Sequence, residues 1–301
     1  MTYPPGYPLA LSGASSDARN GGGSVPVRPT KDLRPSSRLS ARKVAAIGER
    51  LSARDREVLE SVGRFRVMSG EQLQRLYWVE GSPQTRARLA RHGLGRLSGL
   101  GVLAPLDRRV GGVRAGSRGL SFAVGLAGQR LLARGSGRRV RRPYTPGERY
   151  LAHTLAVAGV YVELVEAQRW GVADLLAFDP EPGDWRPYLG PYGARVVLKP
   201  DADLELGIGD YTVSWLLELD MATESLATIE RKARRHLAYH LSGEAQRTRG
   251  VSPRVAWIVP DDQRAAALQA ALDRLPAEGK RLFAVVVRAE AVALLTAEVQ
   301  T

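Results

Sequence analysis

Residues 52–100 read SARDREVLESVGRFRVMSGEQLQRLYWVEGSPQTRARLARHGLGRLSGL. Ser52 and Asp55 form an S-x-x-D capping box, in which each side chain accepts a hydrogen bond from a backbone N–H group at the start of a helix. Two more start signals follow, a second box and a serine cap before a proline at the first helical position: Ser69-Gly70-Glu71-Gln72 and Ser82-Pro83. The stretch therefore predicts three consecutive short helices, over 52–65, 69–77 and 82–99.

Two strands and a glycine-rich turn are expected directly after the third helix. The strands are predicted over 101–110 and 120–124, and a helical segment over 128–134. The turn between the strands, 111–119, is rich in glycine and arginine. Three helices followed by a long basic hairpin predict a winged helix-turn-helix domain over residues 45–136.

The third helix of this domain is basic. A recognition helix places its N-terminal side chains against base edges in the major groove, while apolar positions such as Leu89 are expected to face inward. The side chains expected to bind DNA are Gln84, Thr85, Arg86, Arg88 and Arg91 from this helix, and Arg108, Arg109, Arg114 and Arg118 from the hairpin. Winged helices also dock proteins. An acidic or apolar third helix would favour that alternative, whereas this one is basic. We therefore expect double-stranded DNA as the partner.

The charge of the chain is divided unequally between its halves. Residues 1–150 carry 28 Lys and Arg against 10 Asp and Glu, whereas residues 151–301 carry 16 against 21. A codon bias explains why 39 of the 44 basic residues are arginines, but it does not explain the segregation. A basic half is typical of proteins that bind polyanions, of which nucleic acid is the commonest.

Composition also predicts the domain boundaries. Residues 1–44 are rich in proline, glycine and serine and poor in apolar side chains, so we expect a disordered tail there. Residues 137–147 contain the run Arg138-Arg139-Val140-Arg141-Arg142-Pro143 and are expected to form a basic linker. Residues 148–301 then form a second domain.

Several classes of protein are excluded by what the sequence lacks. It has no cysteine, which excludes disulfides, Cys-ligated zinc, iron–sulfur clusters and a thiol nucleophile. Any metal must then be held by oxygen or histidine, which favours Mg²⁺. No apolar run reaches membrane-spanning length and no signal peptide is evident, so we expect a cytoplasmic protein without membrane contact. No G-x-x-x-x-G-K loop occurs, so no nucleotide cofactor is expected.

The second domain begins with a long apolar helix over 148–170, which we expect to be buried on nearly all sides. The elements expected after it are strands over 172–178, 194–206 and 211–219, a helix over 222–241, a strand over 254–259, a helix over 261–275 and a strand over 281–287. This order predicts a mixed sheet with helices on both faces, so the fold class is α+β or α/β.

Acidic residues gather at two strands of this domain. In Lys199-Pro200-Asp201-Ala202-Asp203-Leu204-Glu205 three acids alternate, so we expect them on one side of a strand. The run Val213–Asp220 ends with two acids on one side. If the strands are neighbours, Asp201, Glu218 and Asp220 converge, and close carboxylates require a divalent cation, a raised pKa or a basic partner. We favour an Mg²⁺ ion that assists phosphodiester hydrolysis.

Each of these features also has a simpler interpretation. Alternating acids are common on the solvated face of an edge strand. His236 and His240 fit a surface pair better than a metal site, and His153 fits a hydrogen-bonded histidine in a buried helix. Glu163 is a further candidate ligand from the first helix of the domain.

Pro200-Asp201 followed by Glu218-Leu219-Asp220 resembles the signature of the PD-(D/E)xK nuclease superfamily, on the element order of a restriction-endonuclease-like domain. The resemblance implies that Asp201 and Glu218 bind Mg²⁺, and Asp220 is expected to help hold the ion. Asp220 stands where the pattern expects lysine, and some members take the basic group from the following helix, where Lys232 lies. Lys199 is a second candidate for this group.

A longer resemblance covers residues 45 to about 295. The winged helix, the His153-Thr154-Leu155-Ala156-Val157 helix, the two acidic motifs and the helix from Lys232 to Tyr239 are similar to the replication-relaxation family. That family is found on actinobacterial plasmids and integrative elements, and its name implies roles in plasmid replication and in relaxing or nicking DNA. The resemblance implies a DNA-binding protein of a mobile element that nicks or processes DNA with Mg²⁺.

Two alternatives remain open at the level of sequence. A non-catalytic protein with the same fold would bind DNA and recruit replication or DNA-transfer proteins through its acidic half. A transcriptional regulator would use the second domain only to form a homodimer.

Overall fold

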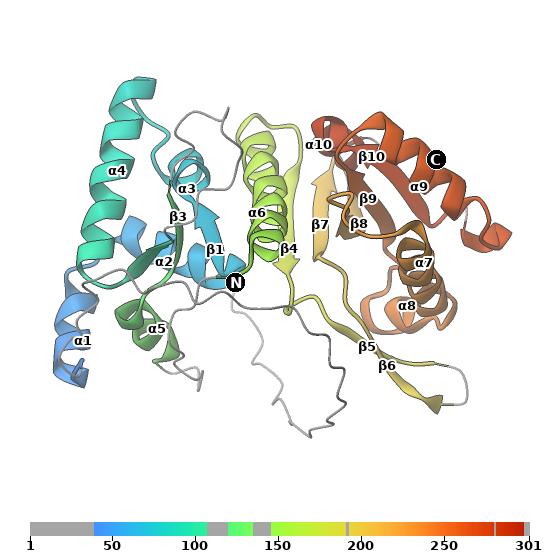
Figure 1. Cartoon of the computed structure of the whole chain (residues 1–301), viewed down its shortest axis with the longest axis horizontal. Helices are drawn as coiled ribbons and strands as arrows, with labels where there is room; N and C mark the ends of the chain where they lie inside the picture. The colour runs from blue at the N-terminus through green and yellow to red at the C-terminus, as the bar shows by residue number, and fades with distance from the viewer. Residues whose placement is uncertain (1–38, 107–119, 135–145, 191–192, 280, 298–301) are drawn as a thin grey trace, which may run out of the picture. The chain divides into compact units, whose positions relative to one another are not determined.

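The three helices expected within residues 52–100 begin at their serine caps. In the computed structural model they are α2 (Ala53–Phe65), α3 (Gly70–Tyr77) and α4 (Pro83–Gly99) (Figure 1). Both capping boxes are complete, because Asp55 Oδ2 accepts a hydrogen bond from Ser52 N at 2.8 Å and Gln72 Oε1 accepts one from Ser69 N at 2.9 Å. Local signals are therefore sufficient to start these helices.

The chain divides into two units, Met1–Leu39 and Ser40–Thr301, and every element named here belongs to the second. The structure describes residues 39–106, 120–134, 146–190, 193–279 and 281–297. The expected disordered tail up to residue 38, the arginine-rich turn and most of the expected basic linker lie outside these residues.

One helix before these three was not predicted. α1 (Ala41–Glu49) starts inside the segment 1–44 that composition assigns to a disordered tail, so the boundary of that segment is corrected to before Ala41. The helix buries Val44 and Ile47, and it contacts α5 (Leu126–Ala133). A stripe of two apolar side chains is too short to stand out as a period in the sequence.

A small antiparallel sheet follows the helices, with strand order β1-β3-β2. Its strands are β1 (Val67–Ser69), β2 (Leu103–Leu106) and β3 (Ser121–Val124). The last two are the expected strands, whereas β1 is too short to show an alternating pattern. α5 lies so close to this sheet that a Cβ on Gly128 would stand 2.3 Å from the carbonyl oxygen of Val102, so glycine is required there.

The orientation of α4 differs from the expectation at one position. Leu89 is 40% exposed, so the prediction that it faces inward is wrong. The buried stripe consists of Ala90, Leu94 and Leu97, spaced four and three residues apart along one face of the helix. Leu89 precedes this stripe by one residue and is rotated away from it.

The second half of the chain forms a five-stranded mixed sheet in the order β10-β9-β8-β7-β4. The strands are β4 (Asp174–Pro180), β7 (Ala202–Ile208), β8 (Tyr211–Leu219), β9 (Arg254–Val259) and β10 (Phe283–Val287). Strands β8, β9 and β10 are parallel, and β4, β7 and β8 form an antiparallel meander. The fold is therefore a mixed α+β arrangement, as the order of elements predicts.

The strand expected over 194–206 is two strands. β6 (Arg195–Leu198) pairs with β5 (Arg186–Leu189) in a separate hairpin, and β7 starts only at Ala202. The break includes Pro200, which has no N–H group to donate to a neighbouring strand. The proline thus ends one strand and places Asp201 immediately before the next.

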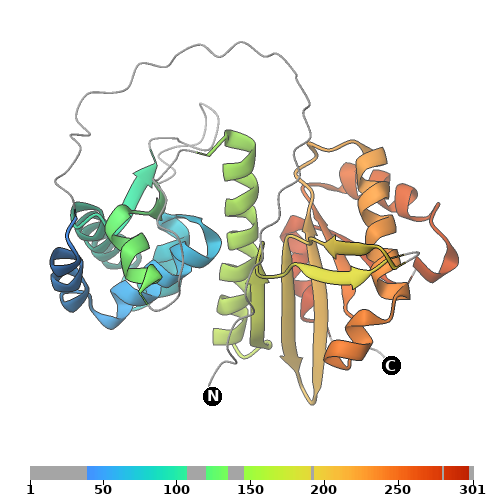
Figure 2. The same ribbon diagram turned by 90° about the horizontal axis from the view of Figure 1, so that it is seen from below.

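Helices cover both faces of the large sheet (Figure 2). α7 (Leu226–Leu241) and α9 (Asp262–Leu272) pack on the face that carries Leu216 and Trp257, with α8 (Glu244–Arg249) following α7. The opposite face meets α6 (Glu148–Arg169), which contacts β4 and β8 and is accompanied by α10 (Ala291–Leu295). α6 also contacts α3 and β1, which explains why it is apolar on several sides.

Within the residues that the structure describes, no helix combines the length and the apolar character that crossing a membrane would require.

Candidate functional site

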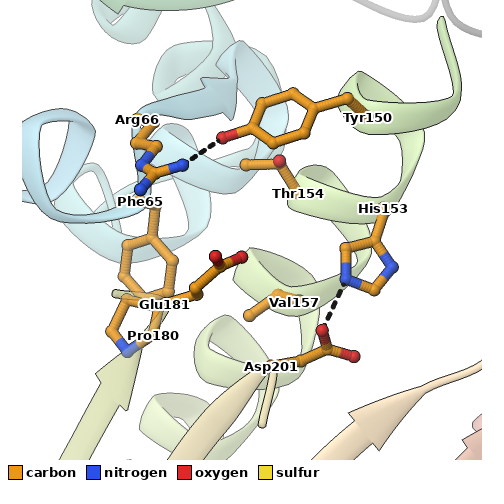
Figure 3. A pocket seen from close by; sticks show the side chains of 9 residues that line it. All are labelled: Phe65, Arg66, Tyr150, His153, Thr154, Val157, Pro180, Glu181 and Asp201. Carbon is orange, nitrogen blue, oxygen red and sulfur yellow. Dashed lines mark hydrogen bonds and ion pairs between the residues drawn. The ribbon is translucent and has the colours of Figure 1, made fainter. Parts of the chain in front are cut away.

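The first turns of α6, the end of β8 and the start of α7 enclose an open cleft of about 500 Å³, called here the α6–β8 cleft. Its charged and polar lining includes Arg149, Tyr150, His153, Asp201, Asp220 and Lys232. A smaller pocket adjoins it and is lined by the same Tyr150, His153 and Asp201, together with Arg66 from the end of α2 (Figure 3). The two hollows therefore share three polar side chains.

Asp201 is fixed at the end of the sheet by its own backbone and side chain. Its N–H group donates to Leu217 O at 2.9 Å, and its Oδ2 accepts a hydrogen bond from Leu219 N at 2.7 Å. Its Oδ1 accepts a hydrogen bond from His153 Nε2 at 2.9 Å. This hydrogen bond raises the pKa of His153 in spite of burial, which acts in the opposite direction. The expected hydrogen bond of His153 is thus present, although the ring is about a third exposed.

Glu218 is buried one residue before the end of β8, and it does not line the α6–β8 cleft. Its Oε1 accepts a hydrogen bond from His236 Nε2 at 2.7 Å, and its Oε2 lies 3.6 Å from Lys232 Nζ. Lys232 Nζ is also 2.9 Å from Glu224 Oε2. Burial lowers the pKa of Lys232, but the carboxylates of Glu218 and Glu224 outweigh burial, so its net pKa is raised.

Asp220 is turned towards α9. Its Oδ2 forms an ion pair with the guanidinium of Arg264, and its Oδ1 accepts a hydrogen bond from Ala222 N at 2.9 Å. The side chain of Asp220 is only 1% exposed, and that of Arg264 only 15%. The residue that stands in place of the expected lysine is therefore one half of a buried ion pair.

As placed, these residues do not fit a hard divalent ion. Mg²⁺ prefers about six oxygen ligands at close to 2.1 Å, whereas Asp201, Glu218 and Asp220 each have a basic partner from a different helix. Across the described ranges, no three Asp, Glu or His side chains come together in a way that could hold a metal. The magnesium ion thus stays a prediction from the sequence.

The two acids of β7, Asp203 and Glu205, belong to a cluster of ion pairs. Asp203 is paired with Arg186 and Arg249, and Glu205 is paired with Arg249. β7 lies between β8 and β4, and Asp203 is 3% exposed, so the interpretation of a solvated edge strand is wrong. Asp201 precedes this strand and turns to α6 instead.

The remaining candidate ligands have other partners. His236 is 2% exposed and His240 hydrogen-bonds Ser252 Oγ at 2.8 Å, so these two histidines do not form a surface pair. Glu163 accepts two hydrogen bonds from Arg288, at 2.6 and 2.8 Å. Lys199 Nζ lies over the ring of Trp185, 3.9 Å from its centre, so Lys232 is the basic candidate that reaches the cleft.

The expected DNA-binding side chains on α4 are accessible. Gln84, Arg88 and Arg91 are exposed, and Thr85 and Arg86 are partly buried. Thr85 is involved in the cap of the helix, because its Oγ1 accepts a hydrogen bond from Ser82 Oγ at 3.0 Å. The hairpin arginines 108, 109, 114 and 118 lie outside the described residues.

The contact between Arg66 and Tyr150 was not predicted from the sequence. Arg66 Nη1 donates a hydrogen bond to Tyr150 Oη at 2.6 Å (Figure 3). Tyr150 and His153 are polar residues three positions apart near the start of a helix whose middle is largely apolar, and this is the signal that could have marked them. Nothing in the sequence around Arg66 indicates its partner, which lies 84 positions away.

Comparison with known proteins gives one match. The family model described as replication-relaxation matches residues 59–255, which include α4, Tyr150, Asp201 and Lys232. No curated protein and no solved structure matches the chain. The matched segment spans well over half of the 301 residues and holds most of the residues that line the cleft. The chain therefore belongs to the replication-relaxation family.

Proposed function

We propose that this protein binds double-stranded DNA and acts in plasmid replication and relaxation, with α4 as the helix that enters the major groove. The observation that carries the proposal is the exposed face of α4. Gln84, Arg88 and Arg91 are spaced four and three residues apart, so they share one face, while the buried stripe from Ala90 to Leu97 occupies another. Glutamine and arginine are suited to base edges and phosphates.

The elements around α4 support this assignment. α2 and α3 precede it, and β2 and β3 follow it, which is the order of a winged helix-turn-helix, and the sequence between the two strands is rich in arginine. The first 150 residues also carry most of the basic charge. Family membership adds the biological setting, because the family is described by replication and relaxation.

The second half of the protein is proposed to act on or near the bound DNA. The carboxylates expected to hold a metal are paired with His153, His236 and Arg264. Metal-dependent nicking therefore depends on a rearrangement of these pairs. The alternative is a domain that recruits a replication or transfer protein.

The binding proposal is tested with duplexes that the full chain selects from a pool with a randomised centre. We expect Arg88→Gln with Arg91→Gln to weaken binding and to lower the slope of log K against log salt by about two, since each phosphate contact contributes about one. The matched control is Arg247→Gln, an arginine on α8 whose side chain is 70% exposed. Equal loss in the control, or no DNA selected at all, contradicts the proposal.

A further inference from the structure

The α6–β8 cleft contains a phenolic hydroxyl group that none of the predicted roles uses. Tyr150 is partly exposed, lines both hollows, and has its hydroxyl held by the guanidinium of Arg66 at 2.6 Å (Figure 3). His153 projects from the same side of α6 one turn later and is held by Asp201. A phenol, a cation on its oxygen and an oriented imidazole thus lie on one wall.

The backbone around this site is strained. Arg66 has φ +68° and Ala222 has φ +54°, and these are the non-glycine residues with positive φ among those described. Arg66 lines the smaller pocket, and Ala222 lies between the cleft residues Met221 and Thr223. Residues other than glycine rarely adopt such backbone conformations. Where these conformations persist, they cluster at functional sites. One such residue thus borders the smaller pocket, and the other borders the adjoining α6–β8 cleft.

Three cationic side chains from different elements line the two hollows that contain Tyr150. Arg66 comes from the end of α2, Arg149 from the first turn of α6 and Lys232 from α7. The raised pKa of Lys232 keeps it charged at neutral pH. One cation on the hydroxyl group and two more in the lining suit a phosphodiester, whose negative charge increases as a fifth oxygen approaches phosphorus.

We propose that Tyr150 is the nucleophile of a DNA strand-transfer reaction that needs no divalent metal, a proposal that rests on the DNA-binding function proposed above. The phenolic oxygen forms a bond to a backbone phosphorus while the bond from that phosphorus to one deoxyribose oxygen breaks. The phenol proton passes to water, and protonated His153 gives a proton to the departing oxygen. The products are a phosphotyrosyl-linked strand and a free hydroxyl end.

The roles of the surrounding residues follow from their contacts. Arg66, Arg149 and Lys232 stabilise the charge on the phosphoryl oxygens, and Asp201 is a positioning residue that orients His153. One ester replaces another, so the reverse reaction reseals the strand by the same steps. Reversible breakage of one strand allows supercoils to relax without leaving a permanent break in the DNA.

The main test uses the full chain, EDTA, negatively supercoiled plasmid, and the radiolabelled duplexes that the protein selects from a randomised pool. We expect a labelled protein band that survives SDS, and a phosphotyrosyl peptide at position 150 in mass spectra. Tyr150→Phe, which removes only one oxygen, should abolish the adduct, while the variant still unfolds cooperatively and still binds the selected duplexes. The control Tyr211→Phe changes a 64% exposed tyrosine at the start of β8 and should keep the adduct.

A second test addresses His153. His153→Asn should slow adduct formation by about 10²-fold or more, the usual contribution of a general acid. A bridging phosphorothiolate at the broken bond supplies a sulfur leaving group that needs no proton. This substrate should restore the rate in His153→Asn but not in Tyr150→Phe, whereas a merely structural His153 would show no such rescue.

The outcomes separate this proposal from the DNA-binding function. Tight DNA binding by the wild type without an adduct overturns the role of Tyr150 and leaves the binding function intact. Absence of DNA binding overturns both. Nicking that requires Mg²⁺, persists in Tyr150→Phe and is lost in Glu218→Gln overturns the role of Tyr150 in favour of a metal-dependent nuclease.

Discussion

The role of Asp220 depends on one neighbouring side chain, Arg264. A carboxylate at the end of a strand, two residues after Glu218, is what a metal site needs, but Arg264 from α9 occupies its Oδ2. Glu218 and Asp201 show the same pattern with His236 and His153. Arg264 neutralises the charge of Asp220, and each histidine gives its carboxylate a hydrogen-bond partner, which is the basic-partner solution to crowded carboxylates.

The buried pair of Asp220 and Arg264 gives a stability prediction. Asp220→Ala leaves the guanidinium of Arg264 buried without its partner, so we expect the free energy of unfolding to fall by about 3 kcal/mol. Asp210→Ala, in the exposed turn between β7 and β8, should change it by less than about 0.5 kcal/mol. Denaturant unfolding measures both. A wild-type melting temperature that rises with Mg²⁺ and no longer does so in Asp220→Ala would instead indicate a metal ligand.

Asp184 gives a prediction of pH dependence. Its side chain is fully buried, neither carboxylate oxygen has a hydrogen-bond partner within the described residues, and burial raises its pKa to about 8. The folded state therefore holds a proton that the unfolded state releases near the ordinary value of 3.8. The contribution of Asp184 is most favourable below pH 4 and declines as pH rises towards 8. Asp184→Asn should flatten this decline in unfolding free energy, and an unchanged pH profile would contradict the assignment.

At the scale of elements, local patterns predicted the longer strands and helices better than the shortest strands. β8 and β9 run over the residues expected for them, and α2, α3 and α4 start at their caps. These elements carry either a complete cap or a continuous apolar run. β1 and β5 were missed because three or four residues hold too little of the alternating pattern.

Two glycines, Gly128 in α5 and Gly95 in α4, give predictions of opposite sign for the change in unfolding free energy. A Cβ on Gly128 would also lie 2.8 Å from Leu59 Cδ1, so Gly128→Ala should destabilise the protein by about 2 kcal/mol through overpacking. A Cβ on Gly95, inside α4, meets nothing within 4 Å. Gly95→Ala should therefore stabilise the protein by about 0.5–1 kcal/mol. Urea unfolding of both variants checks the signs, and a loss of similar size at Gly95 would argue against this account.

At the scale of the whole molecule, α6 connects the elements around α4 with the large sheet. Arg75 on α3 makes two hydrogen bonds to Glu166, at 2.9 and 2.5 Å, and Gln72 donates to Leu155 O at 2.7 Å. These contacts hold α3 against α6, and Arg66 at the end of α2 meets Tyr150 in the first turn of α6. The proposed DNA-binding helix and the cleft thus belong to the same unit of the chain.

The division of charge also has its effect at this scale. The basic first half supplies α4 and Arg66, and the acidic second half supplies carboxylates that pair mostly within that half. DNA would then be attracted to the first half and would meet, in the cleft, carboxylates that already have histidine, lysine or arginine partners. The net charge of the chain conceals this arrangement.

The sequence by itself determined the start of α2, α3 and α4, the order of elements in the mixed sheet, the segregation of charge and the absence of thiol chemistry. These properties depend on composition or on hydrogen bonds between residues a few positions apart. Only the tertiary structure decided that Asp220 meets Arg264, that Asp201 meets His153 and that Arg66 meets Tyr150. Such pairs are 44, 48 and 84 positions apart, so strand register and helix packing, rather than any local pattern, bring their atoms into contact.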